Sequence, residues 1–334
     1  MWCERRDSNS HASRRQNLNL VRLPIPPHSH TPHSTIIHIS RLFEREIFRS
    51  LNYHRHVLLN GYRALPVDHY ENFPIASIVL PKHLRAPIET IYNFARSADD
   101  IADSDELPAT FKQERLEFFR EELKKIQCNQ PPLTTFFSEL GTLIAQHNLP
   151  ITLFFQLLDA FEQDLTIKRY ENFTQLKLYC DRSANPIGRI LLHLFGYTHD
   201  DHLKWSDSIC TSLQIINFLQ DISEDYELGR IYLPQDEMIS FGVTEDHIKN
   251  EVFDLSWLNL MEFQIKRAHQ YLLDGAELYE ILPGRIGIEI KSIVKSGLQV
   301  TRKLSASRGN VFATNHKINS FDFVSIFLQT VFHK

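Results

Sequence analysis

Glycine is scarce in this sequence, at 11 of 334 residues, and methionine is scarcer still, at 3. No apolar run approaches the roughly 18 residues of a membrane-spanning helix, so no transmembrane segment is expected. The four cysteines are scattered and form no CxxC pair. This spacing argues against a disulfide framework or a thiolate metal site, and it favours a reduced, cytoplasmic protein.

Convincing strand patterns are also few, and long helical patterns dominate instead. No internal repeat or low-complexity linker marks a second domain, although the length would allow one. We therefore predict an all-α, single-domain fold. Apolar side chains at helical spacing place its helices over residues 87–102, 110–127, 133–147, 151–167, 173–195, 204–221, 255–282 and 286–304, with a short amphipathic tail over residues 321–332.

Residues 1–60 do not resemble the rest of the chain. They contain arginine but no lysine, and residues 23–33 are rich in proline and histidine. Such a stretch buries too little apolar surface to offset the entropy of ordering. Three interpretations fit: a disordered leader, an arginine-rich targeting peptide, or upstream sequence translated by mistake. We favour the last, with a true start near Val67 and a folded domain over residues 67–334, whose acidic balance argues against nucleic acid as a partner.

Two aspartates, Asp99 and Asp103, stand four residues apart at the end of an apolar helical run. Residues at this spacing share one helix face at about 5–6 Å, where two carboxylates repel each other. A solvated surface tolerates that repulsion. At the end of a buried helix, however, paired acids indicate a bound cation.

A second stripe of side-chain oxygens, formed by Asn217, Asp221 and Asp225, has the same spacing in a stretch rich in Ile, Leu and Phe. The two stripes can face each other across a cavity if their helices pack together. Oxygen ligands of this kind suit Mg²⁺, which is usually held by a few carboxylates and by substrate phosphates. The expected substrate is therefore a diphosphate.

Three further local features carry expectations. Asn185 and Pro186 inside a helical pattern predict a kink that lines a cavity or, alternatively, a break between two helices. Gly229 suits a helix stop. The acids Asp159, Glu162 and Asp164 are interpreted as surface or pairing residues.

The two acidic stretches, residues 92–103 and 214–225, together with Arg-Ile-Tyr-Leu-Pro at 230–234, resemble the motifs of the squalene/phytoene synthase family. Members of that family join or rearrange prenyl diphosphates on an isoprenoid-synthase helical bundle around a central apolar cavity. The resemblance spans roughly residues 67–317. It is strongest to the bacterial hydroxysqualene synthases, on residues 69–77 and 183–189 and on Gln220, where the wider family usually has arginine.

The resemblance implies a role for each matching residue. Two or three Mg²⁺ ions are expected on Asp99, Asp103, Asn217, Asp221 and Asp225. Substrate contacts are expected from Phe73, Tyr92, Arg96, Gln214, Arg230 and Tyr232, with an ion pair to an aspartate as the alternative for Arg96. Arg96 is also a candidate catalytic residue, and Tyr179 and Asn185 are the candidates for handling water or a carbocation.

The reaction implied is conversion of presqualene diphosphate and water to hydroxysqualene and diphosphate, in hopanoid synthesis and without NADPH. The alternatives are head-to-head condensation of two farnesyl diphosphates, phytoene synthesis, and a non-catalytic protein that binds prenyl diphosphate. The implied partners are other enzymes of the squalene pathway. Peripheral contact of the tail with the inner membrane is the alternative to core packing.

Overall fold

The computed structural model of the chain describes residues 81–104, 107–313, 316, 322, 326 and 330. Contacts divide the chain into two units, and all described residues belong to the second, Pro32–Lys334. Apart from turns and loops these residues are helical, and their one β-type pairing is an isolated bridge between Arg169 and Ile231. The all-α prediction is confirmed.

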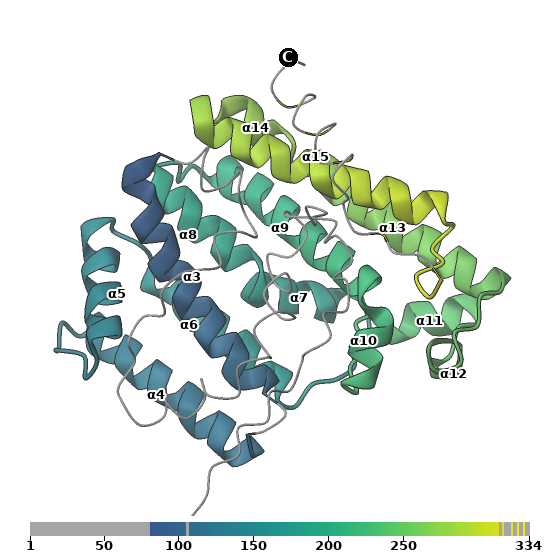
Figure 1. Cartoon of the computed structure of the whole chain (residues 1–334), viewed down its shortest axis with the longest axis horizontal. Helices are drawn as coiled ribbons and strands as arrows, with labels where there is room; N and C mark the ends of the chain where they lie inside the picture. The colour runs from purple at the N-terminus through teal and green to yellow at the C-terminus, as the bar shows by residue number, and fades with distance from the viewer. Residues whose placement is uncertain are drawn as a thin grey trace, which may run out of the picture. The chain divides into compact units, whose positions relative to one another are not determined.

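The helices follow one another with short connections (Figure 1). They are α3 (Lys82–Asp103), α4 (Ala109–Gln127), α5 (Thr135–Gln146), α6 (Ile151–Asp164), α7 (Phe173–Ser183), α8 (Asn185–Phe195), α9 (Asp200–Gln220), α10 (Ile222–Glu227), α11 (Gln235–Phe241), α12 (Glu245–Lys249), α13 (Leu255–Gly275), α14 (Glu277–Ile281) and α15 (Gly284–Ala306).

Local sequence signals explain where several of these helices begin and end. The helical pattern of residues 173–195 breaks at Ala184, which is the predicted alternative to a kink, and Pro186 lies in the first turn of α8, where no backbone N–H is needed. The predicted stop at Gly229 is confirmed, because this residue follows α10 with a φ of 74°. The short helices α11 and α12 were not predicted.

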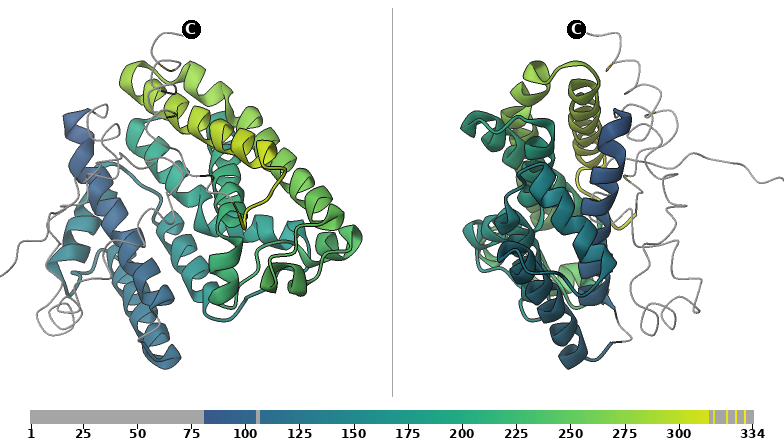
Figure 2. Two further views of the ribbon diagram at one scale, coloured as in Figure 1. Left: turned by 45° about the vertical axis from the view of Figure 1, so that its right-hand side comes forward. Right: turned by 90° about the vertical axis from the view of Figure 1, so that its left-hand side faces the viewer.

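Two apolar cores meet at α8. One core is formed mainly by α9, α13 and α15, and the other by α3, α4, α5 and α6. Ile190 and Leu194 of α8 belong to the second core, whereas Leu192 belongs to the first. In the left view of Figure 2, the inner helices lie between α3, in blue, and the yellow α15. Helix α8 therefore joins the half that carries the first acidic stretch to the half that carries the second.

Some predictions fall outside the described residues. These are the leader over residues 1–60, Phe73 and most of the tail over residues 321–332. Within the described part, no helix combines the length and apolar content needed to cross a bilayer.

Candidate active site

The first acidic stripe occupies the last two turns of α3. The side chains of Asp99 and Asp103 are about one quarter exposed, at 25% and 23%. One turn earlier, Arg96 lies 3.4 Å from Asp99 and 2.6 Å from Asp100. Arg96 therefore forms the ion pair with aspartate that was one of its two predicted roles.

The second stripe crosses the junction of α9 and α10. Although α9 ends at Gln220, the amide of Asp221 donates to the carbonyl of Asn217 at 3.0 Å, and that of Asp225 donates to the carbonyl of Asp221 at 2.8 Å. These bonds keep the helical path, so the three side chains stay on one face. All three residues are at most 3% exposed. Buried carboxylates need cations or hydrogen-bond donors around them, and this stripe is therefore a candidate metal site.

Arg230 brings the two stripes together. The turn at Gly229 reverses the chain, and the Arg230 amide donates to the carbonyl of Asp225 at 2.7 Å. The Arg230 guanidinium, in turn, donates to Asp103 on α3. Figure 1 shows the end of α3 and the short α10 in the same lower region of the view. Burial disfavours the charged form of Arg230, but Tyr232 and Asp103 raise its pKa above the usual value, so the guanidinium stays charged.

The donor set of the two stripes fits Mg²⁺ in its chemistry, since it contains only carboxylate and amide oxygens. Among the described residues, no three carboxylate, imidazole or thiol groups are gathered closely enough to hold a metal by themselves. Mg²⁺ commonly takes one or two carboxylates and fills its shell with water and substrate phosphate. The stripes therefore fit a site that is completed by a diphosphate.

Four aromatic rings, which we call the aromatic box, pack beside this junction: Tyr170, Tyr179, Phe218 and Tyr232. Phe218 and Tyr232 are stacked, with ring centroids 3.8 Å apart and an angle of 7° between planes. Tyr179 lies 6.2 Å from Phe218 and 5.8 Å from Tyr232. Burial raises the pKa of all three tyrosines, so their hydroxyls stay protonated.

Asp164 is a site residue that the sequence analysis missed. Its two companions on α6, Asp159 and Glu162, pair with Arg120 as expected. Asp164 itself is not a surface acid: it is only 7% exposed and accepts a hydrogen bond of 2.7 Å from the Tyr179 hydroxyl. Burial raises its pKa to about 7, while the nearby Arg230 opposes that rise. The sequence feature that indicates its burial is its position on the apolar stripe of α6, one turn after Phe161.

The family model for squalene/phytoene synthase matches residues 67–321. The chain belongs to this family. A hydroxysqualene synthase of Rhodopseudomonas palustris is 35% identical over 239 residues, covering 70% of this chain and 79% of that protein. A presqualene diphosphate synthase of Sinorhizobium fredii is 31% identical over 218 residues, covering 64% of this chain and 76% of that protein. The structure of squalene synthase HpnC from Alicyclobacillus acidocaldarius is 31% identical, with a TM-score of 0.68, covering 72% of this chain and 90% of that one.

Several predicted site residues of this squalene/phytoene synthase-family chain lie near the stripes. Gln214 is buried on α9, one turn before Asn217. Tyr92 lies one turn before Arg96, and burial raises its pKa, as the charges of Asp99 and Asp100 also do. Their contacts with substrate remain predictions.

Asn185 has a structural role in the described contacts. Its amide nitrogen donates to Asp181 at 2.7 Å, and its amide oxygen accepts from the Thr211 hydroxyl at 3.1 Å. These bonds fasten the start of α8 to α7 and α9. Its role in handling water stays a prediction, and a water would have to share the amide oxygen with Thr211.

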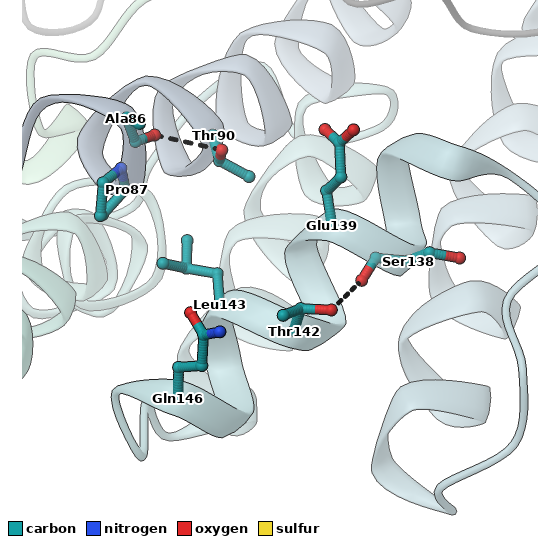
Figure 3. A pocket seen from close by; sticks show the side chains of 8 residues that line it. All are labelled: Ala86, Pro87, Thr90, Ser138, Glu139, Thr142, Leu143 and Gln146. Atoms are coloured by element: carbon teal, nitrogen blue, oxygen red, sulfur yellow. Dashed lines mark hydrogen bonds between the residues drawn. The ribbon is translucent and has the colours of Figure 1, made fainter.

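An open pocket between α3 and α5 lies away from this chemistry (Figure 3). Thr90, Glu139 and Leu143 are among the residues that line it. Thr90 is 13 residues before Asp103 on α3, a rise of about 20 Å. A smaller, more enclosed space adjoins the site itself, and it is lined by Phe218, Asp225, Arg230 and Tyr232 among others.

Proposed function

We propose that this protein converts presqualene diphosphate and water to hydroxysqualene and diphosphate, with Mg²⁺, in squalene and hopanoid synthesis. The observation that carries the proposal is the ion pair between Arg230 and Asp103, which joins both acidic stripes beside the aromatic box. The relatives named hydroxysqualene synthase support the same reaction.

The chemistry begins with heterolysis of the carbon–oxygen bond, and diphosphate leaves with the electron pair. Bound Mg²⁺ would supply Lewis-acid assistance to that departure, held by the aspartates of both stripes. Arg230 offers the planar, permanently charged group that suits phosphate oxygens. Because it is buried, its attraction for the leaving group is screened less than at the surface.

The carbocation left behind needs an apolar, electron-rich wall. Each aromatic face stabilises a cation by about 0.5–2 kcal/mol, and the aromatic box provides Tyr179 and the stacked pair of Phe218 and Tyr232. After rearrangement, the oxygen of water forms the new bond to carbon and one proton is released. No hydride donor is needed, so we propose turnover without NADPH.

The alternative within the family is condensation of two farnesyl diphosphates, which the relative named presqualene diphosphate synthase favours. The phytoene synthase relatives favour the corresponding reaction of longer chains. A non-catalytic protein that binds prenyl diphosphate would bind the same ligands but release no diphosphate.

Product identification separates these functions. Purified protein is incubated with Mg²⁺ and with presqualene, farnesyl or geranylgeranyl diphosphate, each with and without NADPH, and the lipids are identified by mass spectrometry. Hydroxysqualene from presqualene diphosphate, independent of NADPH, is the expected result. Phytoene, presqualene diphosphate or squalene as the main product would assign one of the alternatives.

A further inference from the structure

Asp164 occupies a position that is electrostatically unfavourable for the fold alone. It is the last residue of α6, where the helix dipole presents its negative end, and it is 7% exposed. Burial of its carboxylate raises its pKa to about 7. A buried acid in such a place is typical of functional sites, where charge is arranged for chemistry rather than for stability.

The neighbours of Asp164 link two parts of the site. The Tyr179 hydroxyl of α7 donates to its carboxylate at 2.7 Å. Arg230, which pairs with Asp103 of the first acidic stripe, lies close enough to stabilise its charge. Lys168 donates to the Asp164 backbone carbonyl and partly offsets the negative helix end. Asp164 therefore stands between the diphosphate side of the site and the aromatic box.

The hydrogen bond sets the orientation of Tyr179. Its hydroxyl donates to Asp164, so the lone pairs of the phenol oxygen are directed away from this accepting carboxylate. A hydrogen bond donated to a carboxylate is stronger than one to a neutral acceptor, and it shifts electron density onto the phenol. The ring of Tyr179, which packs 6.2 Å from Phe218 and 5.8 Å from Tyr232, then becomes a better partner for a cation.

We propose that Asp164 is a positioning residue that orients and polarises Tyr179 for the carbocation formed when diphosphate leaves. The proposal deepens the proposed function and rests on it for the nature of that cation. Asp164 itself touches no reacting atom. It acts through Tyr179, and its effect should appear with cationic ligands and not with neutral ones.

The first test measures binding without turnover. Farnesyldimethylamine, which is a cation at pH 8, is titrated into the full-length protein with Mg²⁺ and pyrophosphate, and farnesol serves as the neutral probe. We expect Asp164→Asn to weaken binding of the amine about 10-fold or more and that of farnesol less than about 2-fold. Asn keeps the shape and an accepting oxygen, so only the charge is lost.

The second test is a double-mutant cycle with Tyr179→Phe on the prenyl diphosphate that the wild type consumes. Asp164→Asn is expected to lower kcat about 10- to 100-fold with little change in KM. The double variant is expected to match Tyr179→Phe alone, because Asp164 acts only through the hydroxyl that Tyr179→Phe removes. Asp159→Asn, on the same helix but paired with Arg120 at the surface, is the matched control and should leave kcat unchanged.

Two outcomes would overturn the proposal. One is that folded Asp164→Asn protein binds both the amine and farnesol more weakly by the same factor, or binds both as tightly as the wild type does. The other is additive effects in the cycle, which would show that Asp164 does not act through Tyr179. Failure of the wild type to consume presqualene diphosphate counts against the proposed function alone, because amine binding still tests the role of Asp164.

Discussion

Arg230 and Asp103 form a partly buried ion pair that spans 127 positions of the sequence. Arg230 follows the second acidic stripe, and Asp103 ends the first, so this contact joins the two halves of the site. The attraction between the two charges is strong, because a charged pair in a partly buried setting is screened far less than one at the surface. The same arginine lies beside Asp164 and Tyr232, which makes it the electrostatic centre of the candidate active site.

Replacing Arg230 by lysine should impair turnover although the charge is kept. Lysine lacks the planar fork that can bind Asp103 and a phosphate oxygen together. We expect kcat/KM for the prenyl diphosphate to fall by about 10- to 100-fold, or about 1.4–2.7 kcal/mol. Arg189→Lys, at the half-exposed pair with Asp207, is the control and should stay within about 2-fold. Equal effects of the two substitutions would refute a special role for Arg230.

Asp221→Asn should weaken Mg²⁺ binding, because it removes one anionic ligand from a buried stripe. Calorimetric titration of Mg²⁺ in the presence of a non-reactive prenyl thiodiphosphate is expected to show at least a 10-fold higher Kd, with a similar shift in the Mg²⁺ dependence of activity. Asp236→Asn, at an exposed position of α11, should leave the titration unchanged. An unchanged titration for Asp221→Asn would remove this residue from the metal site.

Glu289 is expected to make the stability of the folded protein depend on pH. It lies on α15, its Oε2 is buried without a hydrogen-bond partner, and burial raises its pKa from 4.5 to about 7. The native state therefore binds this proton more tightly than the unfolded chain does. The stabilising contribution is fully present below pH 4.5 and is lost as the pH rises through 7.

Glu289→Gln removes that titration. Relative to wild type, the variant should gain roughly 1–3 kcal/mol of unfolding free energy between pH 5 and pH 8, measured by urea denaturation at both values. Glu262→Gln, at an exposed position of α13, should show no such trend. Parallel pH profiles for wild type and Glu289→Gln would contradict the assignment of a raised pKa.

Substitution of Gly188 tests how closely α8 packs against α9. A Cβ at this position would clash with the Ser206 hydroxyl and would lie 2.6 Å from the Cys210 sulfur. Gly188→Ala should therefore lower the unfolding free energy by about 1–3 kcal/mol, as overpacked cores do. Adding Ser206→Ala and Cys210→Ala removes both clashing atoms and should recover part of the loss. Without such recovery, the close approach of the two helices is not the cause.

The sequence predicted much of this architecture because its signals are local. Apolar periodicity placed the long helices, the Asn-Pro pair placed the break before α8, and Gly229 placed the end of α10. The spacing of Asp99 with Asp103, and of Asn217 with Asp221 and Asp225, identified both acidic stripes, since residues four apart share a helix face.

The tertiary structure decided what no local pattern encodes. Its spacing from Phe161 places Asp164 on the apolar stripe of α6, but only the packing of α6 against α7 brings it to Tyr179. Likewise, Arg230 reaches Asp103 because the chain reverses at Gly229. Helical spacing determines which side chains share a face, whereas burial and long-range contacts depend on which faces meet, and that is settled only when the two cores pack around α8.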